Sequence, residues 1–163
     1  MKTRTAVSAE TRAAGARTRT EKPAVSAGYS GTPLARKLGI AAGSEVFLVG
    51  PPANYRELVA PLPEGVLFVP RMGKTTDIVH VFATERATLE KAIRAALAKL
   101  RPDGAIWASW PKKSSKIPTD ITEDTIREIA LPLALVDVKV CAVDDVWSGL
   151  KLVIRRENRS KRP

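Results

Sequence analysis

The chain has few of the residues on which disulfides, metal sites and most nucleophilic active sites depend. Its 163 residues include one cysteine, Cys141, and one histidine, His80. A lone cysteine forms no internal disulfide and no cysteine metal cluster. A lone histidine leaves a Ser-His-Asp triad or a multi-histidine zinc site without partners. Both residues lie in apolar runs typical of strands, so we expect them to pack within the fold.

Long hydrophobic segments are absent as well. No stretch approaches the roughly 20 apolar residues of a membrane span. The N-terminal residues contain no apolar core of signal-peptide length. We therefore expect no membrane association and a cytoplasmic location.

The surplus of positive charge belongs to the two ends of the chain. The net charge is +10, and residues 1–27 hold six Lys or Arg against two Glu, while residues 155–163 hold five against one. Such ends attract nucleic acid weakly and without sequence preference. Solvated tails are the simpler interpretation, because neither end interleaves aromatic residues with its charges. We predict a disordered basic tail at 1–27, a folded domain at 28–156 and a basic tail at 157–163.

Short apolar runs alternate with amphipathic segments in the middle of the chain. The runs are nearly continuous, as in a parallel sheet that is covered on both faces. Apolar residues recur at helical spacing from Leu89 to Leu100, and Thr122 offers the cap of another helix. We predict an α/β fold with a single open, mostly parallel sheet flanked by helices and ending in an antiparallel hairpin. The predicted strands are Val46–Val49, Val66–Val69, Ile78–Phe82, Ala105–Ser109, Asp137–Val143 and Leu150–Ile154.

Three segments of this pattern are similar to parts of the S-adenosylmethionine-dependent methyltransferase fold. KLGIAAGSEVFLVG, residues 37–50, resembles the entry to the first strand of that fold. TTDIVHVF, residues 75–82, resembles its fourth strand, and LAKLRPDGAIWASW, residues 97–110, resembles the helix, turn and fifth strand that follow. The resemblance covers about residues 32–156 and implies a reduced Rossmann fold of the methyltransferase kind.

The chain also resembles a family of bacterial proteins that carry a domain of unknown function. The matching segments are AGYSGTPLARKLGI (27–40), WPKKSSKIPTDITED (110–124) and VDVKVCAVDDVWSGLKLV (136–153). That family has no assigned activity, so the resemblance supplies no catalytic residues.

Three features depart from a methyltransferase that binds its cofactor in the usual way. One glycine, Gly50, follows the first strand, and the next two residues are Pro51 and Pro52, which fix φ and remove two N–H donors. No acid follows Val69 at the end of the second strand, where the family binds the ribose hydroxyls. Only Pro70–Thr76 connect to the next strand, so a strand and a helix are missing. We therefore expect no bound cofactor.

The loops that follow parallel strands meet at one edge of the sheet, where ligands bind in such folds. The loop at 112–116, which follows one of these strands, holds three lysines and two serines and leads to a helix start near Thr122. Lysines, hydroxyls and a helix start suit a phosphate or another anion, although a charged loop is often only solvated. Asp144 and Asp145 could neutralise these lysines, bind a cation or form the hairpin turn, and the turn with lysine pairing is the simplest choice. The candidate ligand-binding residues are Gly50, Asn54, Lys112, Lys113, Ser114, Lys116, Asp144, Asp145 and Trp147.

The sequence leaves three functions open. The favoured one is a module without catalysis that recognises an anionic or phosphate-bearing ligand, or a protein partner. The second is an atypical S-adenosylmethionine-dependent methyltransferase, with Asn54, Asp77 or Asp144 in place of the missing acid. The third is a protein that associates with nucleic acid through its tails. A homodimer through the exposed edge of the hairpin is compatible with each.

Overall fold

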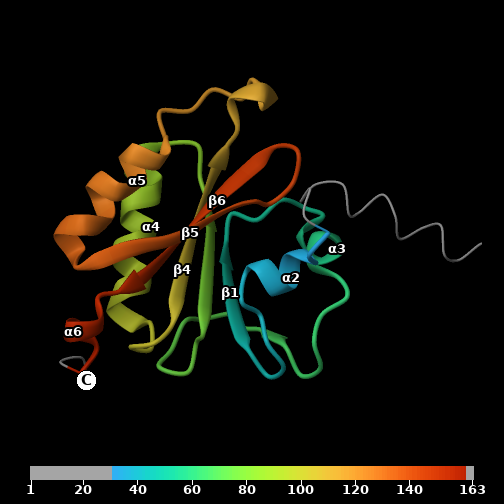
Figure 1. Ribbon diagram of the computed structural model, residues 1–163, viewed down its shortest axis with the longest axis vertical. Coiled ribbons are helices and arrows are strands. Elements are labelled where there is room, and N and C mark those ends of the chain that lie inside the picture. The colour runs from blue at the N-terminus through green and yellow to red at the C-terminus, as the bar shows by residue number, and fades with distance from the viewer. Residues whose placement is uncertain (1–30, 161–163) are drawn as a thin grey trace, which may run out of the picture.

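The described part of the chain, residues 31–160 of the computed structural model, alternates strands with helices (Figure 1). The tail predicted at residues 1–27 lies outside this part. The strands are β1 (Glu45–Val49), β2 (Leu67–Phe68), β3 (Ile78–Phe82), β4 (Ala105–Pro111), β5 (Leu135–Ala142) and β6 (Trp147–Ile154). The helices are α2 (Leu34–Lys37), α3 (Tyr55–Val59), α4 (Arg86–Lys99), α5 (Glu123–Ala130) and α6 (Arg156–Arg159), with 3₁₀ turns η2 (Lys113–Ser115) and η3 (Leu131–Leu133).

The strands form one sheet in the order β2-β1-β3-β4-β6-β5. The first four strands in this order run parallel, and β6 runs antiparallel to both β4 and β5. The predicted fold class is therefore confirmed. Because β6 opposes both neighbours, β5 runs in the direction of the parallel strands, and the tip of the hairpin lies at their carboxyl edge.

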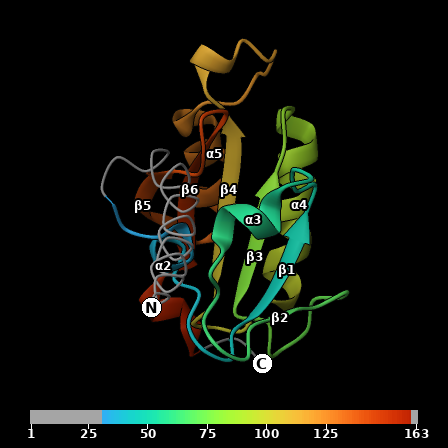
Figure 2. The same cartoon turned by 90° about the vertical axis from the view of Figure 1, so that its right-hand side faces the viewer.

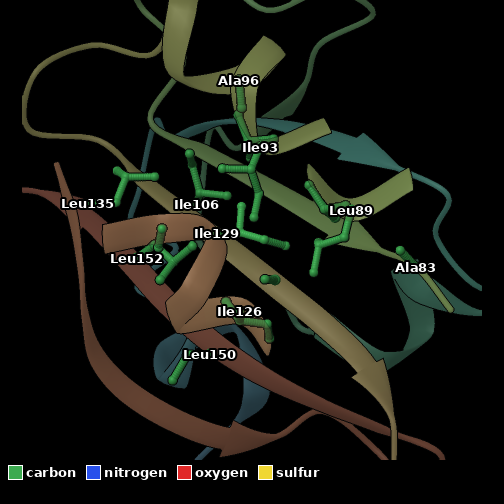
Figure 3. Packing of buried hydrophobic residues seen from close by; sticks show 14 of the residues in the cluster. Ala83, Leu89, Ile93, Ala96, Ile106, Ile126, Ile129, Leu135, Leu150 and Leu152 are labelled. Carbon is green, nitrogen blue, oxygen red and sulfur yellow. The ribbon is translucent and has the colours of Figure 1, made fainter. Parts of the chain in front are cut away.

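Helices cover both faces of this sheet (Figure 2). The larger α4 and α5 pack on one face, and the shorter α2 and α3 pack on the other. β3 is buried along its whole length, which explains its uninterrupted apolar run. Figure 3 shows the side chains that α4, α5 and the sheet share: Leu89, Ile93, Ala96, Ile126, Ile129, Ile106, Leu150 and Leu152 are labelled there.

The predicted cap of α5 is formed by Thr122. Its Oγ1 accepts a hydrogen bond from the Thr125 N–H at 3.2 Å, and Thr125 Oγ1 accepts one from the Thr122 N–H at 3.1 Å. Both N–H groups would otherwise be without an acceptor within the helix. We expect Thr122→Ala to lower the free energy of unfolding by about 1 kcal/mol in urea denaturation. Thr88→Ala, on the exposed face of α4, is the control and should change it by less than about 0.5 kcal/mol.

The connection from β2 to β3 is short because β2 itself is short. β2 has two residues and pairs only with Glu45 and Val46, at the start of β1. The chain therefore passes beside the amino end of β1, where the Asp77 N–H donates to the Glu45 carbonyl at 3.0 Å, and it needs no helix to return along the sheet. The strand and helix that the sequence lacks are missing here too, within the described residues.

The hairpin tip is tighter than the sequence suggests. β6 begins at Trp147, since β4 continues to Pro111 and pairs with it there, so the turn covers 143–146 rather than 144–149. β5 pairs with β6 on one side, and Val138 and Val140 are exposed along this strand. Pairing of this strand with a second copy stays a prediction.

The last helix continues directly from β6. α6 starts at Arg156, and Arg159 Nε donates to the Ile154 carbonyl at 2.9 Å. Between residues 31 and 160, no helix combines the length and the apolar composition that crossing a membrane requires.

Candidate functional site

The carboxyl edge of the parallel strands has a switch in strand order at β1 and β3. From β1 the chain goes to β2 on one side, and then to β3 on the other. At such a point the connections leave in opposite directions, which opens the crevice where open α/β sheets bind ligands. The segments that follow Val49, Phe82 and Pro111 all lie at this edge, together with the hairpin tip.

Gly50 makes the first turn at this edge. Its φ is +65°, in the left-handed region that favours glycine. A Cβ on residue 50 would lie 2.8 Å from the carbonyl oxygen of Phe82, which is closer than real side chains approach backbone. Only glycine therefore lets the loop from Gly50 to Asn54 run directly beside the end of β3.

Asn54 leads this loop into α3. It is exposed, and its side chain makes no hydrogen bond to the described residues, although it occupies the N-cap position. Its backbone carbonyl accepts the N–H groups of Glu57 and Leu58, both at 3.0 Å. The amide of Asn54 is thus free to contact a ligand, whereas Pro51 and Pro52 offer no N–H at all.

A buried chain of hydrogen bonds joins α3, which follows the loop from Gly50 to Asn54, to the sheet. His80 Nδ1 and the Tyr55 hydroxyl are 2.9 Å apart, and His80 Nε2 and Ser109 Oγ are 2.7 Å apart. Burial lowers the pKa of His80 to about 3 and raises that of Tyr55. A neutral imidazole has one donor and one acceptor nitrogen, so it can serve two hydroxyl groups at once. This chain ties α3 to β3 and β4, and the sequence pattern gave no signal for Tyr55 or Ser109.

Aromatic rings surround His80 on the face that α2 and α3 cover. Its ring stacks on Phe82 at a centroid distance of 4.3 Å. Trp147 meets Phe82 edge to face at 5.1 Å and is half-buried, so it joins the hairpin to the end of β3. Trp107 is fully buried in the core and donates to the Leu38 carbonyl at 2.9 Å.

The lysine loop, residues 112–116, projects beyond the same edge (Figure 1). The Lys112 N–H donates to the Val146 carbonyl at 2.7 Å, so the loop lies against the hairpin tip. The start of α5 does not favour an anion, because its N–H groups are capped by Thr122 and its first turn carries Glu123 and Asp124. Binding of an anion by Lys112, Lys113, Ser114 and Lys116 stays a prediction.

The two aspartates at the hairpin tip differ in their surroundings. Asp144 Oδ1 accepts the N–H groups of Val146 and Trp147, both at 2.8 Å, so Asp144 forms the turn. Asp145 is exposed. No ion pair joins either carboxylate to the lysine loop among the described residues. In the same part of the chain, no three His, Cys, Asp or Glu side chains gather as metal ligands.

Asp77 lies at the other end of the sheet from these residues. It precedes β3, accepts the Glu45 N–H at 2.8 Å and binds Arg101 at 2.7 Å. It therefore cannot replace the missing acid at the carboxyl edge. Two hollows of about 290 and 320 Å³ also lie at this amino edge, on either side of Arg101.

Comparison with solved structures places the fold. A "SAM dependent methyltransferase from Aquifex aeolicus" aligns with 74% of this chain and 88% of its own, with a TM-score of 0.50 and 14% identity. A "putative type 11 methyltransferase from Sulfolobus solfataricus" aligns with 69% and 85%, with a TM-score of 0.46 and 13% identity. No family model and no curated protein matches the sequence.

These comparisons confirm the methyltransferase-like Rossmann fold and correct two expectations. The chain was expected to be a module without catalysis and to bind no cofactor, because of Pro51, Pro52 and the missing acid after Val69. The protein of similar structure from Aquifex aeolicus is named a SAM dependent methyltransferase, and this finding overturns both expectations. The resemblance to a family with a domain of unknown function finds no support. At 14% identity, this structural similarity establishes the fold and not the activity.

Proposed function

We propose that this chain is an atypical methyltransferase that binds S-adenosylmethionine at the carboxyl edge of the sheet. The observation that carries the proposal is the turn at Gly50. It stands at the switch between β1 and β3, and it brings the backbone of the following loop against the carbonyl of Phe82. A ligand at that point meets the loop backbone without an intervening side chain.

The residues present fit the cofactor in part. Gly50 provides the close backbone approach, and Asn54 provides an exposed amide with no other hydrogen bond to the described residues. The acidic residue that binds the ribose hydroxyls in this fold is missing. β2 ends level with the start of β1 and does not reach the carboxyl edge. Pro51 and Pro52 remove two donors. The cofactor would therefore be held by different contacts from those usual in the fold, with Asn54 as the main polar side chain.

The positive charge of the cofactor suggests a role for Trp147. When bound, S-adenosylmethionine supplies a methyl group on a positively charged sulfonium. An aromatic ring attracts such a cation, and Trp147 is half-buried at the same edge, against Phe82. His80 is fully buried and neutral, so we assign it the support of the loop rather than proton transfer.

The lysine loop suggests the charge of the substrate. Lys112, Lys113 and Lys116 lie beside the hairpin tip, and no carboxylate among the described residues pairs with them. A substrate that approaches this edge meets positive charge, which favours an anion. We therefore propose an anionic substrate that contacts this loop.

The first test of this proposal is binding of the cofactor by the full chain. At a concentration 100 times the Kd, S-adenosylmethionine or S-adenosylhomocysteine should stabilise the protein by about 2.7 kcal/mol. For a domain of this size, that raises the melting temperature by roughly 5–10 °C. We expect Asn54→Ala to weaken the binding about tenfold, since it removes a direct hydrogen bond.

The control is the same substitution at the other asparagine. Asn158→Ala, in α6 at the far end of β6, should leave binding of the cofactor unchanged. Transfer of a labelled methyl group to an acidic peptide or an RNA would extend the result to activity. An unchanged melting temperature at millimolar S-adenosylmethionine, with no transfer of label, would rule the proposal out.

A further inference from the structure

Two lysines stand side by side near the end of α2, away from the proposed cofactor edge. Lys139 of β5 and Lys151 of β6 are directly paired in the antiparallel register. Side chains of such a pair share one face, with Cβ atoms about 5 Å apart, and like charges placed this way destabilise a sheet. Lys139 Nζ donates to the Lys37 carbonyl at 3.2 Å. Lys151 Nζ lies 3.7 Å from where a Cβ on Gly39 would stand.

No acidic partner compensates this pair within the described residues. Neither Lys139 nor Lys151 forms an ion pair with a carboxylate between residues 31 and 160. Lys151 is also half-buried, so water solvates its charge less well than at an open surface. The pair therefore costs stability in the folded chain, and an anion bound beside it would remove that cost.

The amino-edge hollow, of about 290 Å³, lies beside Lys151. Its lining includes Gly39 and Ser44 as well as Arg101 with its two carboxylate partners, Asp77 and Asp103. Asp77 and Asp103 each hold the guanidinium of Arg101 at 2.7 Å, through Nη1 and Nε. Nη2 of Arg101 makes no hydrogen bond to the described residues, so it remains a donor. The charges of Asp77 and Asp103 together balance those of Arg101 and Lys151, so the surplus positive charge beside the hollow is that of Lys139.

We propose that the amino-edge hollow binds a phosphate group, with Lys151 and Arg101 as its donors and Lys139 as a nearby charge. Donors on charged groups form the stronger hydrogen bonds to phosphate oxygens. The volume holds one phosphate and part of the molecule that carries it, since whole ligands of drug size need pockets of about 300–1,000 Å³. The site is at the opposite edge from Gly50 and Asn54, so it does not depend on methyl transfer.

Phosphate binding by the full chain and by one variant tests this inference. Inorganic phosphate or pyrophosphate should raise the melting temperature of the wild type. Lys151→Gln should weaken the binding about tenfold, through loss of one charged hydrogen bond. Lys91→Gln makes the same change of charge on the exposed face of α4 and should bind like the wild type. Without phosphate, Lys151→Gln should be more stable than the wild type, because the repulsion from Lys139 is relieved.

Two further arms identify the source of the phosphate. A 12-nucleotide single-stranded RNA that competes with pyrophosphate, and binds Lys151→Gln more weakly than Lys91→Gln, would assign the hollow to a polynucleotide. Pyrophosphate binding without such competition would assign it to a small phosphate compound. Equal binding by the wild type and Lys151→Gln, or no binding of either probe, would overturn the inference.

Discussion

Gly50→Ala is expected to lower the free energy of unfolding by about 3 kcal/mol. The left-handed backbone costs a residue with a Cβ roughly 1–2 kcal/mol. In addition, the new Cβ would stand 2.8 Å from the Phe82 carbonyl, and this oxygen belongs to backbone that cannot rotate away. β1 and β3 must then separate at their carboxyl ends, so the strain adds to the conformational cost. Urea denaturation of the wild type and the variant measures the difference.

Gly43→Ala is the matched control for this prediction. Gly43 has a similar φ of +78°, but no atom lies within 4 Å of the position of its Cβ. The free energy of unfolding of Gly43→Ala should therefore fall only by the cost of the left-handed backbone, about 1 kcal/mol. We also expect Gly50→Ala, and not Gly43→Ala, to weaken binding of S-adenosylmethionine. Equal losses of stability in the two variants would show that the approach to Phe82 has no energetic consequence.

Acid is expected to destabilise the fold through His80. The imidazole has a pKa of about 6.5 in the unfolded chain and about 3 in the folded protein, because burial disfavours its charged form. Between these values the unfolded state binds one more proton, so the free energy of unfolding falls as the pH falls. The slope is about 1.4 kcal/mol per pH unit, which amounts to roughly 5 kcal/mol over the whole window. This contribution is fully present above pH 6.5.

The protonation of His80 can be followed directly by NMR, because His80 is the only histidine in the chain. Its imidazole resonances should report a neutral ring in the folded protein down to about pH 4. The free energy of unfolding should also fall more steeply with decreasing pH in the wild type than in His80→Gln. Glutamine keeps hydrogen-bonding groups but does not titrate. Titration of His80 near pH 6.5 in the folded protein would contradict the buried chain from Tyr55 to Ser109.

Much of the fold follows from local sequence. β3 and β4 are buried on both faces, so their apolar runs are continuous, and the predicted residues match the strands closely. The predicted second strand was too long, because Val66–Val69 has the composition of a strand while only Leu67–Phe68 pair. Pro70 then has no N–H with which to continue the ladder. Composition does not show where pairing stops.

The sequence points to candidate site residues only where a single residue carries the signal. Gly50 and Asn54 are recognisable because they follow a buried strand in a known type of fold. The partners of His80 come from α3 and β4, and the pairing of Lys139 with Lys151 depends on the register of the hairpin. Such contacts join residues far apart in sequence, so a local pattern does not contain them. The absence of a cofactor was inferred from three local departures, and the comparison of whole folds contradicts it.

The most direct test of the central proposal is to map S-adenosylhomocysteine onto the chain by NMR. We expect saturable shifts in the amides of Gly50, Ala53 and Asn54, and in those of Ala83 and Thr84 at the end of β3. The Trp147 indole should shift with the same Kd. Shifts confined to the amino edge, or none at millimolar S-adenosylhomocysteine, would contradict a cofactor site at the switch between β1 and β3.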